Sequence, residues 1–345
     1  MILSFCIPTF NRCDYLIKNL KILIEQIVQT QKTNLVEICI SDNASTDRTE
    51  GEVSKIINNN SLLTIKYSKN NKNHGPDRNF VHVMKMATGE YSILWGDDDF
   101  LREGGLNRIF YLVNYGKNNG INIMTSSTSI IDSQGKPLFI KNFLRNDIKE
   151  YIVDFSNPTE SKAYFFLLKD MGGMLSFISD VIYKTSIIYE IPFDDRFLGT
   201  HYAFLCFWWG YLAKGNKLYY NSEPFLDETY QYQSAYGFGV DRLMVDYSGY
   251  TLVADIALAG GKINRVDFLQ AFQGLHPLFS SRIVLLAEQT RYNERILPKL
   301  KECGVEDNEL KSLYDSVSIS YICKNILYKI LPESIILYMK KHKKR

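Results

Sequence analysis

Short apolar runs alternate with longer amphipathic segments along the first 135 residues. An apolar run bounded by turn residues predicts a buried strand, whereas apolar positions three or four residues apart predict a helix with one buried face. The predicted strands are Ile2–Ile7, Val36–Ser41, Leu63–Tyr67, Tyr91–Trp95 and Ile121–Ser126, and the predicted helices are Asp14–Gln29, Asp47–Asn59, Arg78–Met86 and Leu106–Tyr115. This order predicts an α/β fold with a mostly parallel, doubly wound sheet that helices cover on both faces.

The pattern changes after this part of the chain. Between residues 136 and 235, short apolar runs alternate with charged turns, and from about residue 240 onward the periodicity is helical. The helices predicted there are Arg242–Leu258, Val266–Phe272, Ser281–Tyr292 and Glu309–Tyr328. We therefore expect a domain at residues 1–235, with halves at 1–135 and 136–235, followed by a helical C-terminal region at 236–345.

Composition narrows the class of protein. A net charge of +2 over 345 residues does not suit a nucleic-acid-binding protein, so we expect no nucleic-acid partner. The six cysteines include no CxxC pair and have no accompanying histidine cluster, which predicts buried, reduced thiols of a cytosolic protein. No apolar stretch reaches the roughly 18 residues that a membrane-spanning helix needs. The protein is therefore expected to be soluble or peripheral to a membrane.

The C-terminal tail, Ile326–Arg345, combines many apolar residues with five basic side chains among its last six positions. Such a segment is typical of a helix that lies on an anionic membrane surface. A terminal core helix with a solvated basic end has the same pattern, and the sequence leaves both interpretations open.

Polar turns follow several of the predicted strands, where α/β sheets bind their ligands. The turn after Tyr91–Trp95 is Gly96-Asp97-Asp98-Asp99, and adjacent carboxylates repel one another unless a cation neutralises them. Mg²⁺ and Mn²⁺ prefer carboxylate ligands together with substrate phosphates, which indicates a divalent metal site. A solvated acidic turn is the alternative.

Two further turns carry groups suited to a nucleotide. Asp42 ends a predicted strand and could accept a hydrogen bond from a base or ribose, while Ser45 could cap the next helix. Arg78 opens a predicted helix after Gly75, where its guanidinium and the helix N-terminus could both face a phosphate. Each turn alone is also compatible with helix capping or with an exposed surface residue.

In order and spacing, five segments near the start of the chain resemble the family 2 glycosyltransferases. The segments are Pro8-Thr9-Phe10-Asn11-Arg12, Ser41-Asp42-Asn43-Ala44-Ser45-Thr46-Asp47, Asn73-His74-Gly75 with Arg78-Asn79, Ala87-Thr88-Gly89-Glu90-Tyr91, and Trp95-Gly96-Asp97-Asp98-Asp99. The last is also similar to O-antigen sugar transferases of the abequosyltransferase kind. The resemblance implies a GT-A fold and the transfer of a sugar from a nucleotide-sugar donor, with inversion at the anomeric carbon.

The resemblance also implies roles for individual residues. The nucleotide-sugar is expected to contact residues of these turns, namely Pro8, Thr9, Asn11, Arg12, Asp42, Asn43, Ser45, Gly75, Arg78, Asn79 and Asp97. Asp98 and Asp99 are expected to bind Mn²⁺ or Mg²⁺ beside the two phosphates, where the metal acts as a Lewis acid. Family members commonly have Asp where this chain has Gly96, so the sequence leaves open which carboxylate binds the metal.

An inverting transfer needs a base for the proton of the acceptor hydroxyl. Family members often supply it from a Glu-Asp pair well after the metal site, but this chain has Thr200-His201 there. We expect His201 to be the base or a phosphate contact, with Asp194 and Asp195 as rivals and a purely structural histidine as the alternative. The segment Glu228–Gly239 is expected to be a loop that closes over a substrate, or a plain surface loop.

The expected function is the addition of single sugars, because the Gln-x-x-Arg-Trp signature of processive synthases is absent. The reaction is expected to take place at the inner face of the cell membrane. The partners would be a nucleotide-sugar donor, a lipid-linked or surface-glycan acceptor of the O-antigen or capsule type, and the membrane surface, contacted through the basic tail. Residues 1–135 would bind the nucleotide and residues 136–235 the acceptor. A nucleotidyltransferase and a non-catalytic sugar-nucleotide-binding protein are the alternatives. The sequence does not indicate an oligomeric state.

Overall fold

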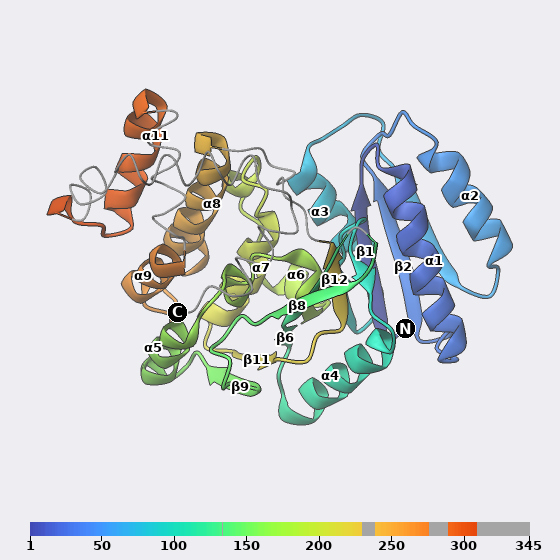
Figure 1. Ribbon diagram of the computed structural model, residues 1–345, viewed down its shortest axis with the longest axis horizontal. Helices are drawn as coiled ribbons and strands as arrows, with labels where there is room; N and C mark the ends of the chain where they lie inside the picture. Colours follow the sequence, from blue (N-terminus) through green and yellow to red (C-terminus); the bar gives the residue numbers. More distant parts are fainter. Residues whose placement is uncertain (133, 230–238, 276–288, 309–345) are drawn as a thin grey trace. The chain divides into compact units, whose positions relative to one another are not determined.

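The computed structural model describes residues 1–132, 134–229, 239–275 and 289–308. The described residues up to 229 form one compact unit together with Gly249–Leu275, whereas residues 239–248 and 289–308 belong to a second. Both β-sheets of the described chain lie in the first unit (Figure 1).

An eight-stranded sheet forms the centre of the first unit, in the order β3-β2-β1-β4-β10-β6-β11-β9. Its strands are β1 (Leu3–Thr9), β2 (Val36–Asp42), β3 (Thr64–Lys69), β4 (Tyr91–Leu94), β6 (Ile123–Ser126), β9 (Glu150–Asp154), β10 (Val181–Lys184) and β11 (Lys217–Asn221). Strands β3, β2, β1 and β4 are parallel, as are β6 and β11, whereas β10 and β9 run antiparallel to their neighbours. The predicted parallel α/β sheet is confirmed over β1–β4, and the antiparallel β10 is an addition that the hydrophobic pattern did not reveal.

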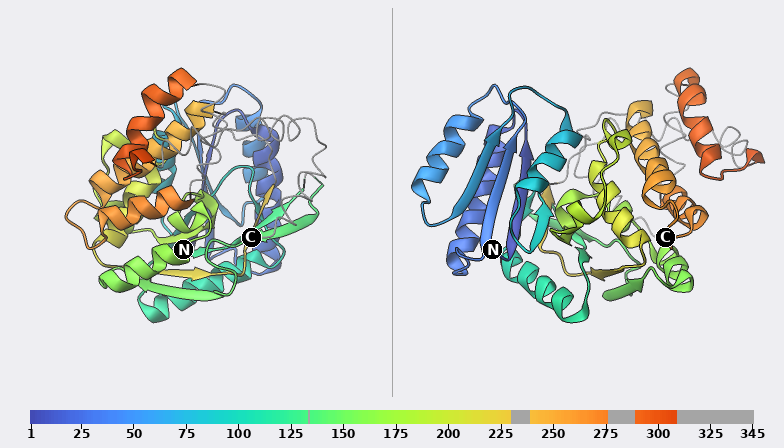
Figure 2. Two further views of the ribbon diagram at one scale, coloured as in Figure 1. Left: turned by 60° about the vertical axis from the view of Figure 1, so that its left-hand side comes forward. Right: turned by 180° about the vertical axis from the view of Figure 1, so that it is seen from behind.

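Helices cover both faces of the parallel half of this sheet (Figure 1, Figure 2). The first four are α1 (Cys13–Gln29), α2 (Thr49–Asn59), α3 (Pro76–Met86) and α4 (Gly105–Asn119). Leu20 of α1 and Ile109 of α4 pack with Phe5 and Ile38 of the strands in one apolar core. Helix α3 packs against β1 and β2 from the other side, where it also contacts α7 (Ala203–Ala213). Because helices meet both faces, β1 and β2 are buried along their whole length.

A second sheet of four strands begins directly after the acidic turn, in the order β5-β12-β7-β8. Its strands are β5 (Phe100–Leu101), β12 (Leu226–Thr229), β7 (Thr128–Ile131) and β8 (Pro137–Lys141). Leu101 pairs with Leu226, so β12 runs beside the acidic turn and brings the carboxylate of Glu228 within electrostatic reach of Asp99. Residues far apart in the sequence therefore surround the acidic turn.

The other described elements of the first unit are helical segments around α7. They are α5 (Pro158–Leu167), α6 (Ile187–Glu190), α9 (Arg265–Leu275), the 3₁₀ turns η1 (Met171–Met174), η2 (Ile178–Asp180) and η3 (Asp195–Phe197), and the π-helical turn η4 (Val253–Ala257). Every residue of α7 is buried, because α3, α6 and η4 pack around it. Aromatic rings fill the space: Trp209 lies 4.8 Å from Phe268, and Tyr250 stacks on Phe272 at 4.7 Å between ring centroids.

The second unit, as far as it is described, contains the first part of α8 (Gly239–Leu252) and α11 (Gln289–Glu302). Arg291 and Arg295 of α11 bind the Asp241 carboxylate of α8, at N–O distances of 2.6 and 2.9 Å. Helices α8, α9 and α11 confirm the predicted helical character of the later part of the chain. Four predicted segments lie wholly or largely outside the described residues: Glu228–Gly239, Ser281–Tyr292, Glu309–Tyr328 and Ile326–Arg345.

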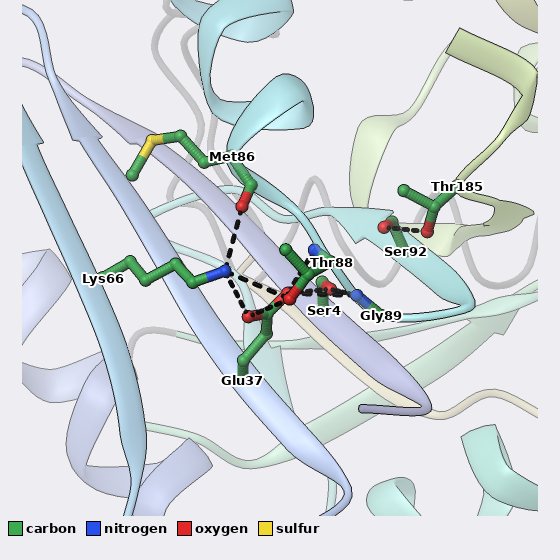
Figure 3. A network of polar contacts seen from close by, with 8 residues as sticks. All are labelled: Ser4, Glu37, Lys66, Met86, Thr88, Gly89, Ser92 and Thr185. Carbon is green, nitrogen blue, oxygen red and sulfur yellow. Dashed lines mark hydrogen bonds and ion pairs between the residues drawn. The ribbon is translucent and has the colours of Figure 1, made fainter. Parts of the chain in front are cut away.

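A buried ionic network ties together the amino ends of the strands, at the edge opposite the polar turns (Figure 3). Glu37 of β2 accepts hydrogen bonds from Ser4 Oγ at 2.6 Å and from Thr88 N at 2.5 Å, and it pairs with Lys66 Nζ of β3 at 2.7 Å. The N–H of Gly89 also donates to Glu37, and a Cβ at Gly89 would come within 2.6 Å of Ser4 Oγ. The network fixes the turn between α3 and β4.

The cysteines of the described residues form no disulfide bonds. Cys6, Cys13, Cys39, Cys206 and Cys303 are free and buried, which confirms the predicted thiols at these positions, and Cys323 lies outside the described residues. Within the part of the chain that the structure describes, no helix has both the length and the apolar character needed to cross a membrane.

Candidate active site

The carboxyl ends of β1, β2 and β4 lie side by side, because these strands are parallel neighbours. Thr9 ends β1, Asp42 ends β2, and the two are register partners. The N–H of Asn43 donates to the Thr9 carbonyl at 2.9 Å, which continues the pairing into the turns. The predicted polar turns therefore meet at one edge, where a parallel sheet places its ligands.

Buried side chains hold the acidic turn after β4 in one shape. Trp95 Nε1 donates to Asn19 Oδ1 at 3.1 Å, and Asn19 Nδ2 donates to the Gly96 carbonyl at 2.8 Å. The Gly96 N–H donates to Ser179 Oγ at 2.8 Å. A Cβ at Gly96 would overlap the Asp99 carboxylate, because the turn folds that carboxylate back toward position 96. Position 96 therefore has no room for a side chain, because the side chain of Asp99 turns inward.

Arg12 joins the first two carboxylates of the turn. Asp97, whose side chain is 8% exposed, accepts a hydrogen bond from Thr9 Oγ1 at 2.8 Å and lies 3.0 Å from Arg12 Nε. Burial raises the pKa of Asp97 to about 7, although Arg12 and Thr9 oppose that rise. Asp98 forms a close ion pair with Arg12 Nη2. Arg12, Asp97 and Thr9, all predicted to be near the nucleotide, are thus brought together.

Asp99 points into the protein. Ser179 Oγ donates to its Oδ2 at 2.5 Å, and burial raises the pKa of Asp99 well above its usual value. Glu228 acts electrostatically on Asp99, and Lys141 forms an ion pair with Glu228 at 2.5 Å. The completely buried Asp180 interacts electrostatically with all three of these side chains. The Asp180 Oδ2 atom has no hydrogen-bond partner among the described residues, and burial also raises its pKa well above the usual value.

Asp98 is the carboxylate of the turn that a ligand can reach most easily, since its side chain is 24% exposed. Within the described residues, no three His, Cys, Asp or Glu side chains are grouped to hold a metal ion by themselves. A divalent ion such as Mg²⁺ often takes only one or two protein carboxylates when substrate phosphates supply the other oxygens. The hard oxygens of Asp98, with those of the more buried Asp97 beside them, fit a site of that kind.

The turn after β2 is held by its own polar groups. Asp42 is completely buried: its Oδ1 accepts from Ser45 N at 2.7 Å and its Oδ2 from Tyr67 OH at 2.6 Å. Ser45 Oγ accepts from the N–H of Asn11, which adopts a left-handed backbone conformation with φ of 53°. Asn11 and Ser45 therefore join the turns after β1 and β2, and Asp42 fixes the shape of the second turn.

The turn before α3 joins the same group. Gly75, with φ of 82°, allows Pro76 to start the helix, and its carbonyl accepts a hydrogen bond from Asn43 Nδ2 at 3.1 Å. Asn79 is buried and accepts from Ser41 Oγ at 2.6 Å. Arg78 is exposed on the first turn of α3. The nucleotide-side residues predicted from the sequence thus come from adjoining turns of one surface.

The predicted base, His201, lies just before α7 with a left-handed φ of 64°. Its N–H donates to the carboxylate of Asp77, in the first turn of α3, at 3.0 Å. Asp194 instead pairs with Arg196 at 2.7 Å, and this contact lowers the pKa of Asp194 to about 2. Asp195 is exposed at the start of η3. Of the three residues, His201 is the one bonded to the helix that begins in the nucleotide-side turns.

Asp194 lines a pocket of the first unit that contains no residue of the acidic turn. This pocket, of about 470 Å³, is also lined by residues of α7, by Lys214 directly after that helix, and by Lys262 after η4. The structure therefore does not bring Asp194 to the carboxylates predicted to bind the metal.

Known proteins are similar to this chain in sequence and in fold. The family description "Glycosyl transferase family 2" matches residues 4–163. The abequosyltransferase RfbV of Salmonella typhimurium is 30% identical over 339 residues, which are 94% of this chain and 96% of that protein. The chain belongs to glycosyl transferase family 2.

Further relatives support the family 2 fold. A GalNAc(5)-diNAcBac-PP-undecaprenol beta-1,3-glucosyltransferase of Campylobacter jejuni is 27% identical over 198 residues, 57% of this chain and 56% of that protein. The crystal structure of S. aureus TarS 1-349 has a TM-score of 0.57 at 16% identity and covers 88% of this chain and 77% of its own. The mannosyltransferase PcManGT of Pyrobaculum calidifontis has a TM-score of 0.51 at 13% identity and covers 95% and 79%. The predicted GT-A fold and transferase class are confirmed.

Sequence reasoning missed four residues around this family 2 site. Asp77 was passed over as part of a turn, because its place in the first turn of α3 does not indicate the distant N–H groups that it binds. Ser179, Asp180 and Lys141 carry no motif of their own, because β10 and β8, which position them, are short and separate in the sequence. Only the pairing of strands shows that they lie beside the acidic turn.

Proposed function

We propose that this family 2 chain is an inverting glycosyltransferase that adds one sugar from a nucleotide-sugar to a lipid-linked glycan of the O-antigen or capsule type. The observation that carries the proposal is the placement of Arg12 against Asp97 and Asp98 at the carboxyl edge of the parallel sheet. Similarity to an abequosyltransferase over 94% of the chain supports the O-antigen class. The undecaprenol-linked acceptor in the name of the C. jejuni relative supports a lipid carrier.

The donor would lie across the turns after β1, β2 and β4. Asp42, Asn43 and Ser45 would form the pocket for the nucleoside, and Arg12 would meet the phosphates, for which its planar guanidinium is suited. A fold neighbour was solved in complex with UDP-GlcNAc, which supports a nucleotide-sugar site on this fold. The nucleotide of this chain's donor is left open, because no contact in the described turns selects one base.

A divalent metal would be held by Asp98, with Asp97 beside it. Bound there with the two phosphates, Mn²⁺ or Mg²⁺ would supply Lewis acidity to the departing nucleoside diphosphate. A fold neighbour was solved with Mn²⁺ and GDP-Man, which supports this choice of cation. Asp99 would support the turn from below, since it is buried against Ser179.

His201 would accept the proton of the acceptor hydroxyl. The acceptor oxygen would form its bond to the anomeric carbon on the face opposite the leaving phosphate, while the bond from that carbon to the phosphate oxygen breaks. The electron pair leaves with the nucleoside diphosphate, and the hydroxyl proton moves to an imidazole nitrogen of His201. The engaged state of Asp194 favours His201 over that rival.

The site of action would be the inner membrane face, with the enzyme held there peripherally. The basic tail that would make this contact, Ile326–Arg345, lies outside the described residues, so its sequence alone supports this part of the proposal. An anionic leaflet attracts clustered Lys and Arg side chains. A lipid-linked acceptor would be presented at the same surface.

The first experiment is thermal unfolding with UDP, CDP, GDP or dTDP, with and without Mn²⁺. A ligand that binds the native state alone must raise its stability, so one nucleotide should give a metal-dependent shift in Tm. Asp98→Asn should lose this shift, whereas Asp147→Asn, at an exposed ion pair of the acceptor half, should keep it. The stabilising nucleotide then names the sugar donors for a turnover assay. No shift with any nucleotide, together with no turnover, would favour a non-catalytic protein.

A further inference from the structure

The carboxylate of Asp77 is buried and faces three backbone N–H groups from one distant segment. Its Oδ2 accepts from Gly199 N at 2.8 Å and from His201 N at 3.0 Å, and its Oδ1 accepts from Ala203 N at 3.0 Å. The side chain is 1% exposed. Both oxygens are therefore committed to the loop that carries the predicted base.

Asp77 supplies the cap that α7 does not supply for itself. The first N–H groups of a helix have no partner within the helix, and a negative charge at this end is favoured by the helix dipole. Tyr202, at the N-cap position of α7, does not cap the helix with its side chain. No basic side chain among the described residues forms an ion pair with Asp77, so backbone N–H groups compensate its buried charge.

The same contact holds His201 in an unfavourable backbone conformation. A φ of 64° is uncommon for residues other than glycine, and such residues persist where their surroundings fix them. The bonds of Asp77 to Gly199 and Ala203, on either side of His201, fix the chain before and after it. The direction of the imidazole thus depends on Asp77.

Helix α3 connects Asp77 to the nucleotide side of the site. The helix starts at Pro76, directly after the turn whose Gly75 carbonyl binds Asn43. Two residues after Asp77, Asn79 binds Ser41 at the end of β2. One helical turn therefore contacts the donor-side turns through one set of residues and the base-bearing loop through another.

We propose that Asp77 is a positioning residue for transfer: it holds the Gly199–Ala203 segment so that His201 faces the acceptor hydroxyl beside the bound donor. The inference rests on the proposed function and adds a residue that acts through His201. Asp77 itself contacts neither the donor nor the acceptor.

The test is Asp77→Asn, which keeps the shape of the side chain but replaces one acceptor oxygen with an N–H₂ group. Transfer kcat should fall about 10- to 100-fold, as misplacement of a catalytic group by about 1 Å does. The affinity for whichever of UDP, CDP, GDP and dTDP stabilises the wild type should change less than about threefold, because the donor-side contacts are kept. Hydrogen exchange of the backbone amides at 199–203 should become faster.

The matched control is Asn157→Ala, which removes the N-cap of α5 and leaves the site untouched. A second arm combines Asp77→Asn with His201→Ala. If Asp77 acts through His201, the double variant should have nearly the same kcat as His201→Ala alone, because both substitutions remove the same contribution to catalysis. Independent, multiplied losses, or a fall in kcat no greater than that of Asn157→Ala, would overturn the proposal.

A further variant keeps the question answerable if Asp77→Asn does not fold. Asp77→Glu retains both acceptor oxygens but displaces them by one methylene group, and it should lower kcat in the same way with the nucleotide affinity kept. Wild-type kcat in Asp77→Glu would refute the positioning role. A wild type that binds no nucleotide and transfers no sugar would instead refute the proposed function, and the exchange rates at 199–203 would still show whether Asp77 holds the loop.

Discussion

Arg12 Nε lies 3.0 Å from Asp97 Oδ1, yet it has no hydrogen-bond partner among the described residues. The guanidinium is directed instead toward Asp98, which it binds through Nη2, and it lies over the ring of Tyr15 at 4.8 Å. Arg12 is thus a counter-ion for the acidic turn. A divalent cation bound to the same carboxylates would compete with it.

Arg12→Gln should therefore bind Mn²⁺ more readily in the absence of nucleotide. The variant loses the guanidinium charge beside Asp97 and Asp98, so the negative charge of these carboxylates is left for a bound cation or a proton to compensate. The expected result is a larger Mn²⁺-induced rise in Tm than in the wild type, measured by thermal unfolding without nucleotide. Arg145→Gln, at an exposed ion pair, is the control. Equal Mn²⁺ shifts in all three proteins would contradict the counter-ion role.

Gly96→Ala should destabilise the protein. The added methyl group overlaps the Asp99 carboxylate, so the turn must shift, at a cost of about 1–3 kcal/mol in the free energy of unfolding. Gly51→Ala is the opposite case, because a Cβ at this position of α2 would have no atom within 4 Å. It should raise the free energy of unfolding by roughly 0.5–1 kcal/mol, since alanine is favoured over glycine in a helix. Urea unfolding of both variants measures the difference. A neutral Gly96→Ala would show that Asp99 moves aside freely.

Glu37 should make stability depend on pH in the acid range. Burial alone would raise its pKa, but Lys66, Ser4 and Thr88 together lower it from 4.5 to about 2. A carboxyl group whose pKa is lowered by folding stabilises the native state above its unfolded pKa, and this stabilisation is lost as the pH falls from about 4.5 toward 2. The contribution is on the order of 2–3 kcal/mol, reduced by solvent around the partly exposed Lys66.

The measurement is urea unfolding of the wild type and Glu37→Gln between pH 3 and 7. The two free energies of unfolding should differ most at neutral pH and converge as the pH falls. Glu25→Gln removes an exposed carboxyl group of α1 and should change the free energy of unfolding by less than about 0.5 kcal/mol throughout. If the difference in free energy of unfolding between the wild type and Glu37→Gln grew toward low pH, the network would not stabilise the ionised form of Glu37.

His201→Asn should lower transfer kcat by about 10²- to 10⁴-fold with little change in nucleotide affinity. Asparagine tolerates a positive φ, so the backbone at this position is kept while the imidazole is removed. His82→Asn, at an exposed position of α3, is the control. Turnover of the donor with its glycan acceptor is the assay. Undiminished kcat in His201→Asn would rule out His201 as the base.

Removal of the residues after about 325 should weaken membrane association while the nucleotide-dependent shift in Tm is kept. The physical reason is the loss of clustered positive charges, each worth about 1 kcal/mol near an anionic surface. Sedimentation with vesicles of anionic and of neutral lipid measures it. Unchanged sedimentation of the truncated chain would refute the membrane role of the tail.

The hydrophobic pattern predicted the nucleotide half of the fold well, because its strands are buried runs separated by complete helices. Each predicted strand from Ile2–Ile7 to Tyr91–Trp95 corresponds to a strand from β1 to β4. The pattern failed for seven strands, β5 and β7 to β12. These strands have two to five residues, too few to show a period, and their pairing is set by contacts between distant parts of the chain.

Among the site residues, sequence motifs located the turns but not the state of each side chain. The three adjacent aspartates indicated a metal site, but they differ in exposure: Asp98 faces outward, whereas Asp99 is buried and faces inward. Gly96, where family members commonly have Asp, left the metal-binding carboxylate open, and the fold has no room for a side chain at this position. Asp77 was missed because its role depends on N–H groups more than a hundred residues later, which no local pattern records.

Helix α7 has no face open to solvent: all of its residues, Ala203 to Ala213, are buried. A new charge or a bulkier ring anywhere along those three turns would have to be accommodated by α3 and η4 at once, so variant libraries of this enzyme should leave the helix unchanged.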